Sequence, residues 1–454
     1  MSNAEAMVKE IFRAAVDAAN PYRAVARVCN DIHALFRGGG FTRLCVVGFG
    51  KASPAMASAL EESLGRLIDE GIIITKYGHT PSRKLERIRL FESGHPIPDE
   101  NGQEASRRLI NLVESAQERT LVITLISGGG SALLVSPIEG ISLADKQETT
   151  DLLLKAGADI HELNTVRKHM SRVKGGRLAE LVYPAASLSL ILSDVVGDRL
   201  DVIASGPTTP DPTTYSDSLA VLEKYNLVKR VPESLMELMA AGQMGKVPET
   251  PKPGNPLFSK TTNVIIGSNR MALDSAKGKA EGFGFRTEVL SAEITGEARD
   301  VGRWLAHKAL VFNRYMGMQS SGCFISGGET TVTVKGKGKG GRNMELALSF
   351  ALEVEGIPGI TLLSAGTDGT DGPTDAAGAV VDGNTIPGAR KGGIDPELHL
   401  CDNNSYDFFK RAGGLLHTGP TGTNVMDIQV ILMEGNDSRT NVAPARREAV
   451  TAKG

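Results

Sequence analysis

The sequence has few cysteines, a small net charge and no long apolar run, and each of these absences excludes a class of protein. Its 4 cysteines are widely separated and form no CxxC pair, which argues against a disulfide framework and a zinc site. No apolar stretch approaches the roughly 20 residues needed to span a bilayer, and the N-terminus does not resemble a signal peptide. A formal net charge of -3 gives no global attraction to nucleic acid or to an anionic membrane. These features predict a cytoplasmic protein that binds neither.

The chain is long and rich in glycine. Its 454 residues are too many for one ordinary core, so we expect two domains. The 52 glycines suit loops that approach a polar ligand closely. Prolines and lysines interrupt the regular patterns before residue 263, so a proline-rich linker is predicted at 246–262. The N-terminal domain is then expected at 1–245 and the C-terminal domain at 263–440.

Short β-branched runs alternate with helical patterns in the first half of the chain. The predicted strands are residues 43–48, 71–76, 120–125 and 188–192, and each precedes a glycine or a polar turn. Helical patterns cover residues 5–36 and 51–65. This alternation predicts an α/β fold with a parallel sheet covered by helices on both faces.

The second half repeats the alternation of strands and helices. Strands are predicted at residues 264–267, 285–290, 322–326, 330–334 and 359–363, and helices at 344–355 and 404–411. The glycines at 327 and 328 suggest a hairpin between two of these strands. We therefore expect a mixed sheet in the C-terminal domain.

The turn after the first predicted strand has the composition of an anion site. Gly48 and Gly50 leave backbone N–H groups free at the start of a helix, and Lys51 adds a positive charge, so nucleotide phosphates could bind here. The segment is not a Walker A loop, because Cys45 stands at its first glycine and Ala52 at its Ser/Thr. The dinucleotide fingerprint is also incomplete. The alternative is a tight turn with a solvated lysine.

A second glycine-rich turn follows the third predicted strand. It consists of Ser127, Gly128, Gly129, Gly130 and Ser131. Three glycines and two hydroxyls favour binding of a phosphate or a substrate carboxylate. The glycine that would complete a nucleophile elbow is missing, which argues against a hydrolase.

A third glycine-rich segment, at residues 336–343, is basic and leads into a predicted helix. Gly340, Gly341, Arg342 and Asn343 form its end. Lysine and arginine among glycines at the start of a helix are the composition expected of a clamp on a nucleotide polyphosphate. The alternative is an exposed, mobile hairpin loop.

Two acidic turns follow predicted strands. Asp368, Asp371 and Asp375 lie in a glycine-rich loop, and oxygen ligands of this kind suit Mg2+, which commonly takes one or two carboxylates. Asp375 is also a plausible turn former. Asp194 follows another strand and is placed to act as a base or as a metal partner.

A basic stretch at residues 164–177 predicts a helix with one apolar side. Arg167, Lys168 and Lys174 are expected on its polar side, where a solvated face is the ordinary interpretation. Among so many anion-binding turns, we predict that Lys168 reaches a substrate carboxylate. His169 has no partner at metal-ligand spacing and is predicted to be structural.

These motifs together resemble the glycerate 2-kinase family over nearly the whole chain. The segments that carry the resemblance are residues 48–52, 127–131, 164–176, 193–195, 203–208, 326–330, 340–343, 366–372 and 418–424. Arg199 and Leu200 depart from the more acidic sequence expected of that turn.

The resemblance implies a Rossmann-like N-terminal domain, a smaller C-terminal α/β domain and an active site in the cleft between them. It also implies that D-glycerate and ATP are the substrates and that Lys51 and Arg342 act in catalysis. In our hypothesis these two cations flank the transferred phosphoryl group, Asp368 and Asp371 hold Mg2+, and Asp194 orients or deprotonates the glycerate hydroxyl. Glu329 is assigned to the nucleotide site with the glycines.

Two other functions are weighed against this hypothesis. One is an NAD(P)-dependent hydroxypyruvate reductase, a name that related sequences have carried, and the incomplete fingerprint argues against it. The other is a non-enzymatic module that senses a sugar phosphate or an acid, which would not need two acidic turns together with a basic loop. The sequence does not fix the oligomeric state, and a homodimer is compatible with it.

Overall fold

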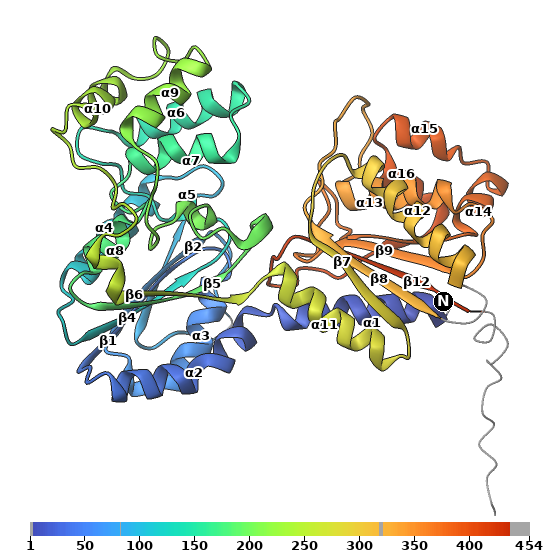
Figure 1. The fold of residues 1–454 in the computed structure, drawn as a ribbon, viewed down its shortest axis with the longest axis horizontal. Coiled ribbons are helices and arrows are strands. Elements are labelled where there is room, and N and C mark those ends of the chain that lie inside the picture. The colour runs from blue at the N-terminus through green and yellow to red at the C-terminus, as the bar shows by residue number, and fades with distance from the viewer. Residues whose placement is uncertain (1–2, 82, 317–320, 436–454) are drawn as a thin grey trace, which may run out of the picture. The chain divides into compact units, whose positions relative to one another are not determined.

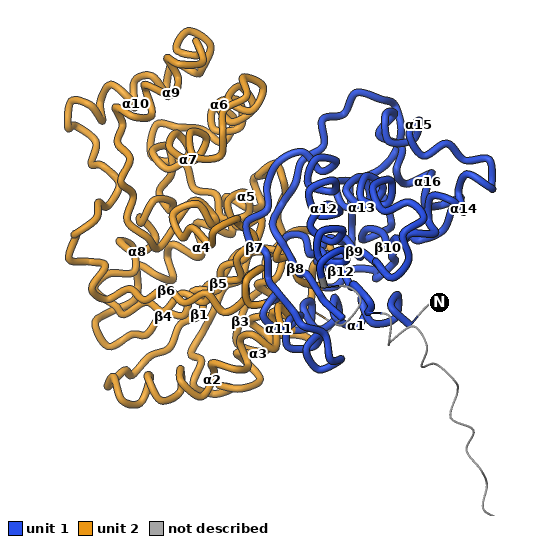
Figure 2. Tube along the Cα trace, turned by 45° about the vertical axis from the view of Figure 1, so that its right-hand side comes forward, with its two compact units in different colours: residues 1–17, 272–421, 426–454 blue, residues 18–271, 422–425 orange. Residues whose placement is uncertain are grey.

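The computed structural model describes residues 3–81, 83–316 and 321–435. Its elements divide into two compact units (Figure 2). Unit 1 takes the chain up to residue 17, residues 272–421 and those from 426 onward, and unit 2 takes residues 18–271 and 422–425. Both units combine helices with a six-stranded sheet, so the α/β fold class is confirmed.

The division between the units differs from the predicted domains at both ends of the N-terminal part. Helix α1 (Asn3–Ala18) lies mostly in unit 1, where Ser275 Oγ donates to the Ala14 carbonyl at 3.1 Å. Residues 246–271 belong to unit 2, because strand β6 (Thr261–Gly267) pairs with its sheet. Sequence pattern did not reveal these contacts, since each joins residues far apart in the chain.

The sheet of unit 2 is parallel throughout. Its order is β3 (Ile88–Ser93), β2 (Glu70–Lys76), β1 (Arg43–Phe49), β4 (Thr120–Ile126), β5 (Ala186–Leu192) and β6. This is the order of the doubly wound dinucleotide-binding sheet, in which the chain leaves β1 toward opposite edges. The predicted parallel sheet is therefore confirmed.

Both faces of this sheet are covered because its strands are apolar on both sides. Leu44 and Val46 of β1 pack with α2 (Pro21–Gly38) and α3 (Ser53–Leu64). Cys45 and Val47 point the opposite way, toward α4 (Glu100–Glu114) and α8 (Arg177–Val182).

A further group of helices in unit 2 has a core of its own. It comprises α6 (Leu143–Lys155), α7 (Ile160–His169), α9 (Tyr215–Lys224) and α10 (Glu233–Gln243), which gather at one end of the unit (Figure 1). Helix α7 ends at His169, so the helix predicted through residue 177 is wrong beyond that point. Instead Ser171 forms an isolated bridge with Pro137, and Gly175 and Gly176 adopt positive φ.

The sheet of unit 1 is mixed, as predicted. Its order is β11 (Leu415–Leu416), β10 (Gly378–Asp382), β9 (Ile360–Gly366), β12 (Asp427–Met433), β8 (Gly322–Gly328) and β7 (Arg286–Ile294). Only the β7–β8 pair is parallel. The predicted hairpin after β8 is wrong, because β12 occupies the position beside β8, and Thr331 forms only an isolated bridge with Glu297.

Helices cover the unit 1 sheet as well. On one face, α12 (Ala298–Met316), α13 (Arg342–Glu353), α14 (Thr385–Lys391), α15 (Pro396–Cys401) and α16 (Ser405–Ala412) surround a common core. Helix α11 (Asn269–Gly282) runs beside α1 below the sheet (Figure 1). None of the helices in the described ranges is long and apolar enough to cross a membrane.

Candidate active site

The first two glycine-rich turns of the sequence lie side by side in unit 2. They follow β1 and β4, which are adjacent and parallel, so their carboxyl ends meet at one edge. Lys51 N donates to the Gly128 carbonyl at 2.9 Å, and Ala52 N donates to Ser127 Oγ at 3.1 Å. The pair of strands is also the point where the strand order reverses, and open α/β sheets bind their ligands there.

Glycine is required in these turns because other groups approach its Cα closely. A Cβ on Gly50, whose φ is +127°, would lie 2.2 Å from Ser127 Oγ. A Cβ on Gly128 would lie 2.2 Å from Asp194 Oδ2. Gly48 differs, since its Cβ would meet Ile73 at 2.6 Å inside the sheet. Gly48 therefore serves strand packing, whereas Gly50 and Gly128 bring functional groups together.

Gly129 is the point on which two side chains converge. A Cβ there would lie 3.0 Å from His95 Nε2 and 3.4 Å from Lys51 Cε. Lys51 makes no side-chain hydrogen bond or ion pair within the described parts of the chain, so its charge is available to a ligand. Burial, followed by the charge of Lys51, lowers the pKa of His95 to about 4. His95 is thus a neutral polar group at pH 7, and sequence reasoning missed it.

Ser131, at the far end of the second turn, is held by buried polar groups. Its Oγ accepts from Arg167 Nη2 at 2.7 Å and lies 2.7 Å from Ser205 Oγ. Its carbonyl accepts from Lys174 Nζ at 2.7 Å. Gly130, between Gly129 and Ser131, begins the short helix α5 (Gly130–Leu133). The turn is therefore fixed in place before any ligand arrives.

The neighbouring 3-10 helix Ile203–Ser205 stores backbone strain. Ala204 and Ser205 have φ of 50° and 62°, a region that residues with a Cβ rarely adopt. Strain of this kind persists where the surroundings enforce it, and it clusters at functional sites.

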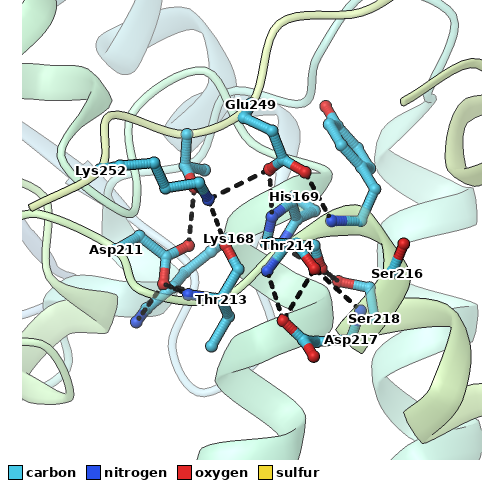
Figure 3. Close-up of polar contacts among 12 residues, drawn as sticks. Lys168, His169, Asp211, Thr213, Thr214, Ser216, Asp217, Ser218, Glu249 and Lys252 are labelled. Carbon is cyan, nitrogen blue, oxygen red and sulfur yellow. Dashed lines mark hydrogen bonds and ion pairs between the residues drawn. The ribbon is translucent and has the colours of Figure 1, made fainter. Parts of the chain in front are cut away.

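Lys168 lies elsewhere, in a buried polar network (Figure 3). Its Nζ is 3.3 Å from Asp211 Oδ1, and the two side chains are 4% and 0% exposed. In the same network, His169 contacts the Thr165 carbonyl and Glu249. Because Asp211 already neutralises Lys168, this placement gives no support to the predicted contact with a substrate carboxylate.

In unit 1, Arg342 at the start of α13 is the centre of an ion-pair cluster. Asp427 Oδ2 accepts from Nε at 2.5 Å and Oδ1 from Nη2 at 2.9 Å, while Nη1 lies 3.0 Å from Glu329 Oε1. Burial opposes the charged form, but the hydrogen bond to Asp427 and the negative charges of Asp427, Glu329 and Asp371 together outweigh it and raise the pKa of Arg342. Asp427 was missed because a lone aspartate at the start of a strand carries no sequence signal.

The two aspartates predicted to hold Mg2+ have different surroundings. Asp371 caps α13, since its oxygens accept from Asn343 N at 3.1 Å and Met344 N at 2.8 Å, and burial raises its pKa to about 7. Asp368 is partly exposed and accepts from Thr370 N and Oγ1. A Cβ on Gly366 would lie 3.3 Å from an oxygen of Asp368 and 3.6 Å from one of Asp427.

No group of three or more His, Cys, Asp or Glu able to hold a metal occurs in the described ranges. Mg2+ needs only one or two carboxylates when phosphate and water complete its shell. Asp368 fits this requirement. Asp427 lies near it, but both oxygens of Asp427 accept from Arg342. Asp371 does not fit, because both of its oxygens are committed to a helix terminus.

The basic loop before α13 is attached to the unit through its backbone. The N–H groups of Gly336, Lys337 and Lys339 donate to the side chains of Asn403, Asp402 and Asn404, respectively. This pattern argues against a free hairpin loop.

The end of that loop packs tightly against neighbouring groups. A Cβ on Gly340 would lie 2.3 Å from Ser405 Oγ, and one on Gly341 would lie 2.3 Å from Asp371 Cγ. The Asn343 side chain is buried between Ser364 and Asp371. Gly340 and Gly341 therefore bring the loop against its supports, and the side chain of Asn343 is structural in the conformation described.

The sequence and the structure are similar to those of known proteins. A model described as a domain of unknown function (DUF4147) matches residues 7–240, and the MOFRL family model matches residues 322–427. The D-glycerate 2-kinase of Thermotoga maritima is 45% identical and aligns over 93% of this chain and 97% of its own. A protein of Agrobacterium vitis named putative hydroxypyruvate reductase is 40% identical over 95% of each. The crystal structure of the glycerate kinase of T. maritima gives a TM-score of 0.86 at 44% identity, over 95% of this chain and 99% of that one.

Proposed function

The chain belongs to the glycerate 2-kinase family, and from that premise we propose that it transfers the γ-phosphoryl group of ATP to the 2-hydroxyl of D-glycerate. The observation that carries the proposal is the convergence of Lys51 on Gly129 at the switch point of the sheet. Phosphoryl transfer depends on positioning and on neutralising charge rather than on a covalent nucleophile. A rigid anion-binding turn beside an unpaired lysine supplies both.

Residues of unit 2 are proposed to bind and orient the transferred phosphoryl group and the acceptor. Lys51 neutralises charge on the transferred phosphoryl group, and Gly50 lets its turn pack against Ser127. The turn at residues 127–131 positions the acceptor. Asp194, which lies against Gly128, orients or deprotonates the 2-hydroxyl.

In unit 1, Arg342 is proposed to stabilise the phosphoryl charge with Nη1, the guanidinium nitrogen that does not contact Asp427. Glu329, beside that nitrogen, sets its orientation. Asp368 would hold Mg2+, and the ion would supply charge neutralisation on the phosphates when bound. Gly340 and Gly341 keep Arg342 and its loop close to Asp371.

Product formation tests the proposal. ADP release is measured with ATP and Mg2+ in the presence and the absence of D-glycerate. Release that depends on D-glycerate supports a kinase, whereas equal release in both mixtures contradicts it. A cytoplasmic location, the absence of nucleic-acid partners and a homodimeric assembly are further parts of the proposal, and none of them is needed for this test.

A further inference from the structure

A group of cationic side chains around α6 and α7 of unit 2 lacks an acidic partner. Lys146 of α6, Arg167 of α7 and Lys174 form no ion pair with any residue in the described ranges, and Lys146 and Lys174 are 2% and 1% exposed. Burying a charge is costly unless it is paired, so protein interiors usually pair it. Lys168, the next residue after Arg167, follows that rule with Asp211. The three cations are therefore an exception that calls for an explanation.

Hydrogen-bond donors in the same region also lack acceptors. Lys146 Nζ, Arg167 Nε and Asn164 Nδ2 are buried and have no hydrogen-bond partner among the residues that the structure describes. The great majority of buried donors in proteins have a partner. All three groups donate, and two of them carry positive charge, so the chemistry that is missing is that of an anionic acceptor. Water alone would satisfy the donors without neutralising the charge.

A pocket lies against two of these residues. It has a volume of about 540 Å³ and is lined by Lys146 and Arg167, by residues 96–98 and by residues of α6 that include Glu148, Asp151 and Leu154. Ile97 and Leu154 are 68% and 58% exposed, so apolar side chains lie at its outer part and the buried cations lie at its base. Of the two carboxylates in the lining, Asp151 is paired with Lys155. This combination suits a small organic anion.

Arg167 connects this pocket to the candidate active site. Its Nη2 donates to Ser131 Oγ at 2.7 Å, and Ser131 lies two residues from Gly129, on which Lys51 and His95 converge. Two residues of chain span at most about 7 Å. An anion held by Arg167 would therefore lie beside the turn that carries the position proposed for phosphoryl transfer.

From this geometry we propose that Lys146 and Arg167 hold the carboxylate of the acceptor substrate at the base of the pocket. The inference rests on the proposed function, and it gives Lys146 and Arg167 the role that the sequence had assigned to Lys168. The bound carboxylate supplies the missing acceptor. The adjacent hydroxyl then points along the turn from Ser131 toward Lys51, which selects the 2-hydroxyl over the 3-hydroxyl.

Lys146 is the better residue to test, because Arg167 also supports Ser131. Lys146→Met keeps an unbranched side chain that is one heavy atom shorter and removes its charge. The matched control is Lys155→Met, on the same helix, where Lys155 is exposed and paired with Asp151. Binding of D-glycerate and of inorganic phosphate to the full-length protein is measured by calorimetry for the wild type and both variants, together with KM for ATP and thermal unfolding.

Lys146→Met is expected to weaken D-glycerate binding by about 10- to 100-fold, the effect of removing a hydrogen bond to a charged group. KM for ATP and the affinity of Lys155→Met for D-glycerate should stay within about twofold of the wild type. Without ligand, Lys146→Met should unfold a few °C higher, because a buried unpaired charge is gone. A packing role for Lys146 predicts the opposite shift in Tm.

Equal affinities of the wild type and Lys146→Met for D-glycerate would overturn the proposal. So would weakened phosphate and ATP binding with D-glycerate unaffected, because the cations would then serve the nucleotide. A lower Tm together with lost binding would assign Lys146 to packing and also overturn it. If the wild type binds D-glycerate through Lys146 but releases no ADP, the carboxylate site stands and the kinase function fails.

Discussion

The guanidinium of Arg342 and the carboxylate of Asp427 form a bidentate ion pair, with Nε 2.5 Å from Oδ2 and Nη2 2.9 Å from Oδ1. Asp427 is 1% exposed, so removing Arg342 leaves a buried charge with one partner fewer. Such a change typically costs about 3 to 5 kcal/mol of stability. A loss of activity in Arg342→Gln alone would therefore mix catalysis with unfolding.

The double variant Arg342→Gln with Asp427→Asn separates the two effects. We expect urea unfolding to show that it recovers much of the stability lost in Arg342→Gln, because the buried charge is removed with its partner. Turnover should remain about 100-fold or more below the wild type, since the cation at the phosphoryl group is still absent. Recovery of activity along with stability would show that Arg342 is structural only.

Lys51→Met should lower turnover strongly and change stability little. Its ammonium forms no hydrogen bond or ion pair in the parts of the chain that the structure describes, so the free energy of unfolding should change by less than about 1 kcal/mol. Turnover should fall by about 100-fold or more, because a charge on the developing phosphoryl oxygens is lost. Lys229→Met, at an exposed lysine of the same unit, is the control. Activity of Lys51→Met near that of the control would exclude a catalytic role.

Asp368→Asn and Asp371→Asn form a second pair with distinct expectations. Asp368→Asn should raise the Mg2+ concentration needed for half-maximal rate, because a neutral amide is a poorer ligand for a hard cation. Asp371→Asn should leave the Mg2+ titration unchanged and destabilise the fold by about 1 kcal/mol through a weakened helix cap. Metal titrations and urea unfolding of both variants check this. A shifted titration in Asp371→Asn and none in Asp368→Asn would reverse the assignment.

The pH dependence of stability reports on Lys146. Burial, and then the charge of Arg167, lowers the pKa of Lys146 from 10.5 to about 7 in the folded chain. Between these pKa values the unfolded chain binds more protons than the folded chain, so stability rises with pH from about 7 to about 10. Below pH 7 the folded chain bears the full free-energy cost of burying the charged ammonium of Lys146. The pKa of Lys174 is lowered in the same direction, mainly by burial. Urea unfolding at pH 7, 8 and 9 should give a smaller slope for Lys146→Met than for the wild type, and equal slopes would refute the assignment.

Local sequence patterns predicted the parts of the site that are contiguous in the chain. The turns containing Gly50 and Gly129 could be recognised because a buried strand followed by glycines before a helix is a local signal. The fold class followed from the same alternation of strands and helices. The pairing in the unit 1 sheet was harder to predict. Strand β12 pairs with β8 across about a hundred residues and takes the position that the predicted hairpin had given to residues 330–334.

The rest of the site depends on contacts that no local pattern encodes. Lys168 and Arg167 are neighbours in sequence, and only the fold shows that Asp211 neutralises one while the other reaches Ser131. Asp427 and His95 were missed for the same reason, because each becomes significant only beside its partner in space. The charges at residues 164–177 predicted a solvent-exposed face, but tertiary packing buries Lys168 and Lys174.

The identity of the phosphorylated hydroxyl tests the central claim most directly. The product of wild-type enzyme with ATP, Mg2+ and D-glycerate is treated with enolase alone, and phosphoenolpyruvate is measured by its absorbance. Enolase dehydrates 2-phosphoglycerate and does not act on the 3-isomer, so the account predicts phosphoenolpyruvate without any further enzyme. Phosphoenolpyruvate that appears only after a phosphoglycerate mutase is added would contradict it, and nicotinamide oxidation without ATP would favour the reductase instead.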